Sequence, residues 1–395
     1  MSSFRSLRVA TVVLIAGITC AAQASEFRTM GVRALSMGGA AVACPAPAYA
    51  AYYNPAALGL DDRSAIDISL GLGVADTGLA AHLDPLMAYD WNAAIANPQG
   101  SEATAIITEL KKIKSTDALM IKPDAAVAMR LYHLASGVYG SAQFVVYANL
   151  DLAHINQTGL SDPNSFAFNS SELFLKGLGL VEVPLAYGTS FKVGESGTLC
   201  VGGALKYIEG ATYDVRQGVF ITSDSDQIRD RLTNADKMSS GFGVDLGLLY
   251  RTMEDRLSLG LLARNLNSPK FETVTGDSFA EDAQLRAGAA YKVSEHIIAA
   301  LDVDLTSNKT LVTGYNSRQV SAGIGYEARI FAVRGGVTKD IEANGSPVVW
   351  SLGTSLGDEA LHLDLAASVS GSSQTYDKYT IPSEGSFMVA LGGGW

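Results

Sequence analysis

Three features of the sequence together predict an all-β fold: a fourteen-stranded antiparallel transmembrane β-barrel with an N-terminal lumen plug and a partly helical external loop. The chain begins with an export signal, most of it alternates apolar and polar residues, and it ends on Phe387-Met-Val-Ala-Leu-Gly-Gly-Gly-Trp395. In a barrel strand, alternate side chains face the lipid and the lumen. An alternating strand that ends on an aromatic residue resembles the signal recognised by the barrel-assembly machinery, so we expect Phe387 and Trp395 to form such a signal. Trp395 should also anchor the strand at the membrane interface.

The first residues predict export to the outer membrane. Arg5 and Arg8 form a positive region, residues 9–18 are apolar, and Ala22-Gln23-Ala24 is a small-x-small cleavage site. We therefore expect a signal peptide at 1–24 that is cleaved after Ala24. Beyond it no run of about 18 apolar residues remains, which disfavours a membrane-spanning helix.

The composition fits a barrel better than a water-soluble domain. Hydrophobic residues make up 48% of the chain, and the mean hydropathy is +0.17 despite a net charge of −11. A barrel resolves this conflict because its strands turn every second, apolar residue toward outer-membrane lipid. The 40 glycines suit strands whose lumen side must leave room. The acidic balance and the lack of a basic stripe exclude nucleic acid as a partner.

Beyond residue 63, alternation predicts fourteen strands. Leu257-Ser258-Leu259-Gly260-Leu261 shows the pattern, with one apolar and one small or polar face. The segments lie near 64–76, 123–134, 137–152, 179–193, 197–216, 239–252, 255–270, 282–293, 295–307, 317–328, 330–340, 347–357, 360–371 and 385–395.

The lengths of the connections support this reading. After even-numbered strands they are short: Ala135-Ser136, Gly194-Glu195-Ser196, Met253-Glu254, Ser294, 328–329 and Gly357-Asp358-Glu359. After odd-numbered strands they are longer, notably 77–122, 153–178, 217–238 and 372–384. Short periplasmic turns that alternate with long external loops are expected of an outer-membrane barrel.

One external insertion, 83–118, is predicted to be partly helical. Within 101–114, Ile106, Ile107, Leu110 and Ile113 fall at helical spacing. Such a helix could be a partner site, or it could pack on the rim of its own barrel. The chain is thereby divided into the signal peptide at 1–24, a plug or hatch at 25–63, and a barrel at 64–395.

No pattern of residues indicates an enzyme. The five histidines are scattered without metal-ligand spacing, and no Gly-x-Ser-x-Gly or P-loop occurs. We therefore expect no catalytic residue, no cofactor and no metal site. His362 and Asp364 do share one face of a predicted strand.

Charged residues of both signs alternate toward the predicted lumen. Charges of mixed sign in a lumen either pair with each other and with plug backbone or form a track for a substrate. The candidates are Arg130, Arg264, Arg286, Asp302, Asp304, Arg334 and Asp364, with Asp67, Glu182, Lys206, Asp245 and His362 on the same faces.

The strongest motif lies in the plug region. Gly31-Val-Arg33-Ala34-Leu-Ser-Met37-Gly38-Gly39-Ala40 is followed by Ala51-Tyr52-Tyr53-Asn54-Pro55-Ala56-Ala57-Leu58. Glycines let backbone pass through a crowded lumen, and Asn-Pro forms a turn. The pattern resembles the hatch of the FadL-type outer-membrane barrel family. The helical insertion at 83–118, which runs into Pro123-Asp-Ala-Ala-Val-Ala-Met-Arg-Leu131, is similar to the plasmid-transfer-operon TraF-like branch of that family. The hatch candidates are Gly31, Arg33, Met37, Gly38, Gly39, Asn54, Pro55 and Ala56.

The resemblance implies an outer-membrane barrel that binds or passes a small hydrophobic or amphipathic molecule. The alternative is a non-transporting barrel with transfer or secretion components as partners, serving conjugal transfer (TraF-like) or protein secretion (PorV-like). In FadL relatives a ligand can leave through a gap in the wall beside the hatch. Pro184, in the middle of a predicted strand, removes a ladder donor, so we expect a wall kink there, either a gap or a harmless bulge.

Two cysteines remain after the signal peptide, Cys44 in the plug region and Cys200 on a lumen-facing position. In an oxidising compartment they could form a disulfide that ties plug to wall if their Cα atoms approach within about 7 Å. The alternative is two unpaired small hydrophobic side chains.

Overall fold

The computed structural model describes residues 24–90, 93–94, 97, 99–154, 170–218, 236–274, 276, 278–343, 345–376 and 379–395. The predicted signal peptide, except Ala24, lies outside the described residues, as do the middle parts of two predicted long loops.

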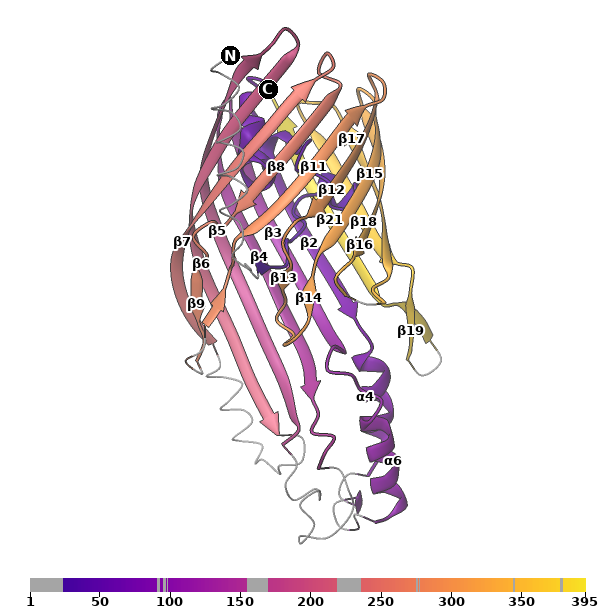
Figure 1. Cartoon of the computed structure of the whole chain (residues 1–395). Helices are drawn as coiled ribbons and strands as arrows, with labels where there is room; N and C mark the ends of the chain where they lie inside the picture. The colour runs from indigo at the N-terminus through magenta and orange to yellow at the C-terminus, as the bar shows by residue number, and fades with distance from the viewer. Residues whose placement is uncertain are drawn as a thin grey trace, which may run out of the picture.

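Fourteen antiparallel strands form one closed barrel, as the alternation predicts (Figure 1). In order around the wall they are β2 (Ala65–Asp76), β3 (Ala118–Leu131), β4 (Leu134–Asn149), β5 (Glu172–Val193), β6 (Gly197–Gly218), β7 (Asp236–Thr252), β8 (Leu257–Arg264), β11 (Gln284–Lys292), β12 (Ile297–Asp304), β15 (Gln319–Glu327), β16 (Phe331–Asp340), β17 (Val348–Gly357), β18 (His362–Ser370) and β21 (Glu384–Gly394). The last strand pairs with the first, from Ala65–Gly394 to Ala75–Glu384, which closes the seam.

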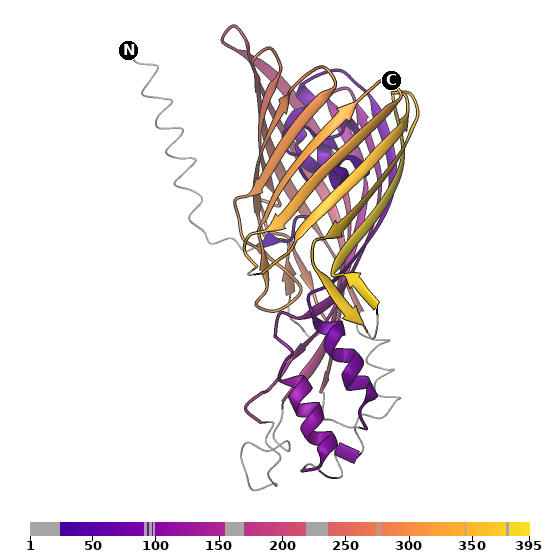
Figure 2. The same cartoon turned by 90° about the vertical axis from the view of Figure 1, so that its right-hand side faces the viewer.

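The connections define two ends of the barrel. The end with the shorter connections, here the short-turn end, also carries the C-terminus, and the opposite, long-loop end carries the longer connections (Figures 1 and 2). One turn differs from the prediction: Leu131 pairs with Leu134, so the first tight turn is Tyr132-His133 and Ala135-Ser136 lie inside β4. Tyr132 adopts φ 55°, a left-handed conformation that lets the chain reverse in two residues.

The outer wall is apolar. On β2 the side chains of Ile66, Ile68, Leu70 and Leu72 are exposed, whereas Asp67 and Ser69 between them are buried. Since an outward apolar band matches lipid, this face is the membrane-contacting surface of the barrel.

At the long-loop end, β4 to β6 and a helical pair project beyond the other strands (Figure 1). Helix α4 (Leu79–Ala88) starts before the predicted insertion because the Asp76 carboxylate accepts hydrogen bonds from the Gly78 and Ala80 amides. Ile106 and Leu110 of helix α6 (Ser101–Leu110), with Ile113 just beyond it, pack against α4 and neighbouring strand ends, so these side chains are covered by the protein itself. The helices of the described part are each too short or too polar to cross a membrane.

Short elements complete the long-loop half. They are β1 (Ala24–Ser25) beside β13 (Asn308–Lys309) and β14 (Asn316–Ser317), and the hairpins β9 (Lys270–Glu272) with β10 (Ser278–Ala280) and β19 (Ser373–Tyr376) with β20 (Tyr379–Pro382). Phe271 of β9 is buried against Gly210 of β6 and joins an apolar cluster with Met120, Leu311 and Val312.

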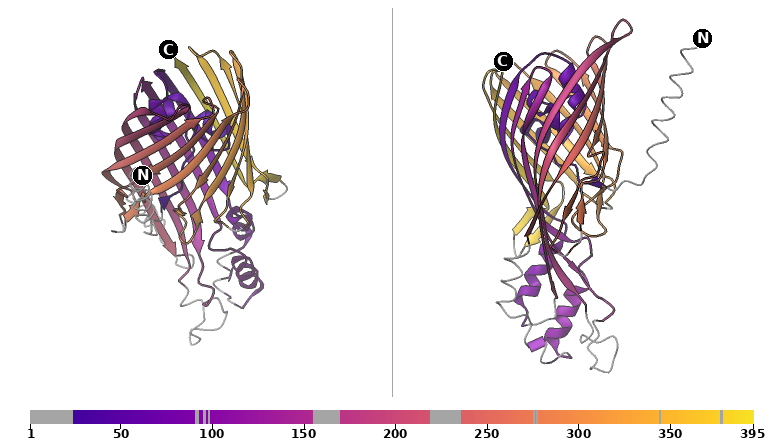
Figure 3. Two further views of the ribbon diagram at one scale, coloured as in Figure 1. Left: turned by 45° about the horizontal axis from the view of Figure 1, so that its top comes forward. Right: turned by 90° about the vertical axis from the view of Figure 1, so that its left-hand side faces the viewer.

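Residues 26–63, here called the inner segment, lie inside the ring of strands (Figure 3). They form α2 (Val32–Ser36), the 3₁₀ turn η1 (Pro47–Tyr49), α3 (Ala50–Tyr53) and the 3₁₀ turn η2 (Pro55–Gly59). The segment contacts β5 to β7 on one side and β16 to β18 on the other.

We expect deletion of Trp395 to lower the amount of barrel in the outer membrane. Its side chain is 69% exposed at the short-turn end, and its backbone exchanges two hydrogen bonds with Ser64, of 3.1 and 3.2 Å. Deletion removes both the interface aromatic and two bonds beside the seam. Trp395→Phe serves as the control. A normal outer-membrane level of the truncated chain, measured by heat-modifiable gel shift, would contradict this prediction.

Candidate functional site: the inner segment and the lumen

Lumen-facing glycines in the wall allow the inner segment to pack directly against the strands; this packing surface is here called its seat. On eight strands, a Cβ added to a lumen-facing glycine would lie 2.1–3.0 Å from an inner-segment atom. At such distances only a hydrogen fits, so the wall and the inner segment are in direct contact. These glycines are Gly188, Gly202, Gly247, Gly260, Gly288, Gly323, Gly336 and Gly353. Strand β12 instead offers Asp302, whose carboxylate accepts hydrogen bonds from the Ala41 and Val42 amides at 2.8 and 2.9 Å.

The Asn54-Pro55-Ala56 turn anchors the segment to β7. Asn54 is 0% exposed, and its amide group donates to the Val42 carbonyl at 3.0 Å and to the Leu248 carbonyl of the wall at 3.1 Å. Its side-chain oxygen accepts from the Ala56 amide at 3.1 Å, which caps η2. One side chain therefore joins the turn, a distant part of the segment, and the wall.

The glycine-rich part of the motif is equally close to the wall. Gly31 precedes α2 at φ 84° and leaves room for the Tyr49 ring, while Gly38 at φ 69° lies against the Val337 backbone. The Gly38 carbonyl accepts a hydrogen bond from the Thr338 hydroxyl. Both glycines combine a left-handed conformation with close contact, so a side chain at either position would be strained.

The remaining motif residues have different surroundings. Gly39, at φ 93°, lies beside Ser321, and the backbone of Met37 rests on Gly323 and Gly336. The Arg33 guanidinium forms an ion pair with Glu327 of β15 at 2.8 Å. The segment is therefore held by a salt bridge as well as by packing.

An aromatic cluster that sequence reasoning missed forms the centre of the segment. Tyr52 packs against Phe27, Tyr53 and Tyr139 of β4 with ring centroids 5.1–5.9 Å apart. The Arg286 guanidinium lies 4.0 Å from the Phe27 centroid, and that of Arg264 lies 4.2 Å from the Tyr52 centroid. The pair Tyr52-Tyr53 directly before Asn54 was the available sequence signal.

The lumen charges of β5 to β8 form one buried network. The Glu182 carboxylate forms ion pairs with Lys206 at 2.8 Å and with Arg264 at 2.5 Å. Lys206 forms a further ion pair with Asp245 at 3.1 Å. Two cations thus face two carboxylates in a buried environment. Removing one partner of a buried pair costs about 3–5 kcal/mol, so the network resists rearrangement.

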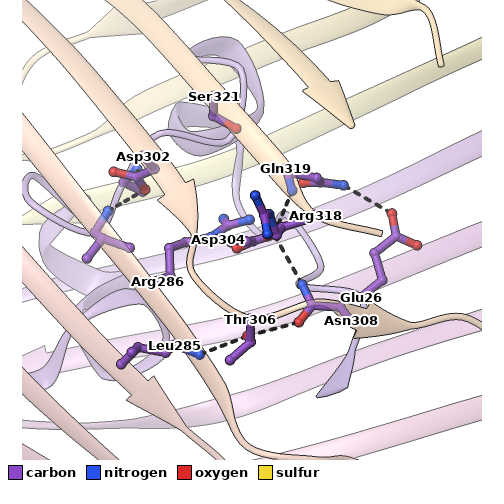
Figure 4. A network of polar contacts seen from close by, with 12 residues as sticks. Glu26, Leu285, Arg286, Asp302, Asp304, Thr306, Asn308, Arg318, Gln319 and Ser321 are labelled. Atoms are coloured by element: carbon purple, nitrogen blue, oxygen red, sulfur yellow. Dashed lines mark hydrogen bonds and ion pairs between the residues drawn. The ribbon is translucent and has the colours of Figure 1, made fainter. Parts of the chain in front are cut away.

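A second network links the wall to the start of the segment (Figure 4). Arg286 donates to Asp304 at 2.6 Å, and Asp304 also accepts from Asn308 at 3.1 Å and from the Gln319 amide at 2.9 Å. The Gln319 side chain in turn donates to Glu26 at 3.2 Å. Paired charges explain this part of the lumen without a substrate.

Arg130 and Arg334 form ion pairs inside the barrel near the short-turn end. Arg130 forms an ion pair with Asp61 at 2.8 Å, and Arg334 contacts Glu327 at 3.3 Å and Ser355 at 2.7 Å. Burial alone would raise the pKa of the Asp61 carboxyl, but Arg63 and Arg130 together hold that pKa below its usual value. Asp364 interacts electrostatically with Arg334 and lies beside His362, whose Nε2 is 3.7 Å from its Oδ2.

The inner segment separates two chambers. The long-loop chamber has a volume of about 190 Å³, with Phe27, Arg28, Leu35 and Gly39 on one side, and wall residues that include Lys122 and Ser386. The short-turn chamber has a volume of about 700 Å³ and is lined by Arg33, Tyr49, Glu327 and the turns near Ala328 and Asp358 among others.

The family follows from the sequence match. The model described as "F plasmid transfer operon, TraF, protein" matches residues 51–304, from the inner segment to β12 and more than half of the chain. The chain belongs to this TraF family. The match confirms the resemblance to the TraF-like branch that the sequence predicts. No curated protein gives a significant match to the chain.

Solved structures share the fold of this TraF-family barrel. The monoaromatic hydrocarbon channel CymD matches with 13% identity and a TM-score of 0.50, covering 94% of this chain and 98% of that one. The toluene transporter TbuX of Ralstonia pickettii matches at 15%, with a TM-score of 0.49 and coverage of 93% and 99%. A Pseudomonas aeruginosa FadL homologue matches at 12%, with 0.49 and coverage of 94% and 99%. At these identities the CymD match shows the fold alone.

One predicted wall feature of the TraF-family barrel is corrected. β5 passes through Pro184 without an inserted residue, since the register to β4 is the same before and after it, from Tyr139–Glu182 to Ser136–Leu185. The predicted bulge is therefore absent. The ladder lacks the two pairs opposite Val183 and Pro184, where proline supplies no amide, and Ser136 donates to the Pro184 carbonyl at 2.8 Å.

Of the two alternatives for Cys44 and Cys200, the structure shows the unpaired one, because both cysteines are free. Cys44 packs beside Ala290 and Ala300 of β11 and β12, whereas Cys200 packs under η2 against Leu58. The two thiols thus serve separate apolar clusters, which is the alternative that the sequence analysis left open.

Proposed function

We propose that this barrel binds a small amphipathic molecule in the long-loop chamber and controls its passage across the outer membrane. The observation that carries the proposal is the chamber itself. It lies on the long-loop side of the inner segment and is lined by apolar Phe27 and Met388 together with charged Lys122 and Glu384. Its volume is below the roughly 300–1,000 Å³ of sites for drug-sized ligands, so the ligand is small.

The shared fold supports transport in preference to catalysis. CymD, the matched structure with a TM-score of 0.50, is a monoaromatic hydrocarbon channel. In this chain the tight seat of the inner segment means that passage requires the segment to shift or the wall beside it to open. One such place is on β3, where Lys122 and Pro123 lack ladder pairs to β4.

A chamber-filling variant tests the proposal. Ser386 of β21 lines the chamber, whereas Val389 lies on the outward face of the same strand. We expect Ser386→Phe to lower uptake of radiolabelled toluene or decanoic acid by expressing cells at least tenfold, and Val389→Phe to leave uptake unchanged. Both variants should show the normal heat-modifiable gel shift.

Equal uptake by cells with and without the wild-type barrel, for both probes, would overturn the transport proposal. The second candidate is a non-transporting role in conjugal transfer, which the description of the matching family favours. In that case deletion of the gene would lower plasmid transfer frequency, and Ser386→Phe would restore transfer as well as the wild type does.

A further inference from the structure

Three side chains of metal-ligand type converge in the short-turn chamber. Asp67 of β2 and His362 and Asp364 of β18 each offer one ligand atom, and these atoms lie within 4.8 Å of one another. All three residues line the chamber of about 700 Å³. The sequence analysis expected no metal site because the histidines lack local spacing, but here the ligands come from the two ends of the barrel sequence.

The register of the closing seam brings the three side chains together. β21 lies between β2 and β18, and Gly392 pairs with Asp67 on one side and with His362 on the other. Asp364 follows two residues after His362 and so shares its lumen face. A Cβ on Gly392 would lie 2.6 Å from His362 Nε2 and 2.8 Å from Asp67 Oδ2, so the missing side chain provides the space in which these atoms meet.

The Asp364 carboxylate is buried without full compensation. The residue is 6% exposed, and its Oδ1 has no hydrogen-bond partner among the described residues. Its Oδ2 lies 3.7 Å from His362 Nε2, beyond hydrogen-bond range. Arg334 interacts electrostatically with Asp364 but directs its hydrogen bonds to Glu327 and Ser355, so it leaves Asp364 Oδ1 without a donor. A buried carboxylate without a donor is costly unless a cation completes its environment.

Asp67 is already oriented for such a cation. The Tyr49 hydroxyl donates to Asp67 Oδ1 at 2.7 Å, which leaves Oδ2 on the side of His362 and Gly392. Hydrogen bonds from outside the ligand set commonly orient metal-binding carboxylates in this way. Because Tyr49 belongs to the inner segment, the same bond connects the site to that segment.

We propose that Asp67, His362 and Asp364 bind a divalent first-row transition metal of the Zn²⁺ class. One imidazole nitrogen with two carboxylate oxygens suits such a metal, with bonds of about 2.0–2.2 Å. Small side-chain rotations bring atoms that lie within 4.8 Å to the separation of about 3.4 Å that tetrahedral bonds of this length imply. The remaining position opens toward the chamber. The metal joins β2 to β18 across β21 and so fastens the seam.

Metal titration of the purified full-length barrel tests the site. The protein, without a polyhistidine tag, is treated with EDTA and titrated with Zn²⁺ by calorimetry, and thermal unfolding is followed in detergent. We expect one Zn²⁺ per chain and a rise in Tm, with His362→Gln and Asp364→Asn each weakening binding at least tenfold and abolishing the rise in Tm. His133→Gln is the matched control, since His133 also lies at this end but contacts only one carboxylate, Asp62.

Tyr49→Phe gives a second measurement that leaves all three ligands in place. Loss of the orienting hydrogen bond should weaken Zn²⁺ binding by about 10–100-fold. The proposal is overturned if the wild type binds no Zn²⁺, or if His362→Gln binds Zn²⁺ as tightly as the wild type. If Asp364→Asn does not show the heat-modifiable shift, the variant has not folded. The His362→Gln variant, whose wild-type side chain is partly exposed, and the Tyr49→Phe variant then decide the outcome.

Discussion

Gly202→Leu is expected to displace the inner segment from its seat and to open the lumen. A Cβ at this position of β6 would lie 2.3 Å from the Pro55 carbonyl carbon and 2.5 Å from the Ala56 amide nitrogen. These are backbone atoms of a buried turn, so no flexible side chain can move aside. Overpacking of a close contact costs about 1–3 kcal/mol or more, and a full leucine side chain increases the conflict.

Gly203→Leu is the matched control for this result. Gly203 faces outward on the same strand, and a Cβ there would meet its nearest neighbour, the Leu246 side chain, at 3.4 Å. We expect Gly202→Leu to give a several-fold higher ion conductance in planar bilayers than the wild type, while Gly203→Leu behaves as the wild type. An assembled Gly202→Leu barrel with wild-type conductance would show that the segment does not seal the lumen.

The double change Asn54→Ala and Pro55→Leu is expected to release the same turn by a different route. Asn54→Ala leaves the Val42 and Leu248 carbonyls and the Ala56 amide without their side-chain partner. Each buried group left unsatisfied costs about 1–3 kcal/mol. Pro55→Leu adds backbone freedom to the unbound turn. The hydrogen bonds between the wall strands are unchanged, so the thermal stability of the barrel should change little while the lumen becomes more open.

Conductance and thermal unfolding, measured on one preparation, separate these two effects. We expect raised conductance with a small change in Tm for the double variant. Asp62→Ala, which removes an exposed carboxylate of the same segment, should change neither. Unchanged permeability of the double variant would mean that the segment is a passive seal held by its glycine contacts, or that the barrel does not transport.

Strand number, the direction of side chains and the two kinds of end followed from local patterns. A period of two specifies which residues face lipid, so Asp67, Glu182 and Asp302 were assigned to the lumen side from alternation, and their burial agrees. The turn at Tyr132-His133 was misplaced by three residues, since apolar residues on both sides of a tight turn continue the alternation without a break. Alternation carries no information about where a chain reverses.

The partners of these lumen-facing residues depend on register and on the path of the inner segment. Pro184 was expected to distort β5, but the strand is held on its other edge by continuous pairing with β6, so the proline costs two ladder pairs and no bulge. Cys44 was assigned to the plug and Cys200 to a lumen-facing position, but Cys44 packs against β11 and β12, whereas Cys200 of β6 packs against the inner segment at η2.

The sequence by itself therefore determined the fourteen strands, their inward and outward faces and the family, because each depends on spacing over a few residues or on a contiguous motif. Only the tertiary structure decided that Gly202 meets Pro55, that Asn54 bonds Leu248, and that Asp67 meets His362 beside Gly392. These contacts join residues far apart in the chain. They arise from barrel closure, which fixes the register between the first and last strands, and from the contacts of the inner segment with the wall.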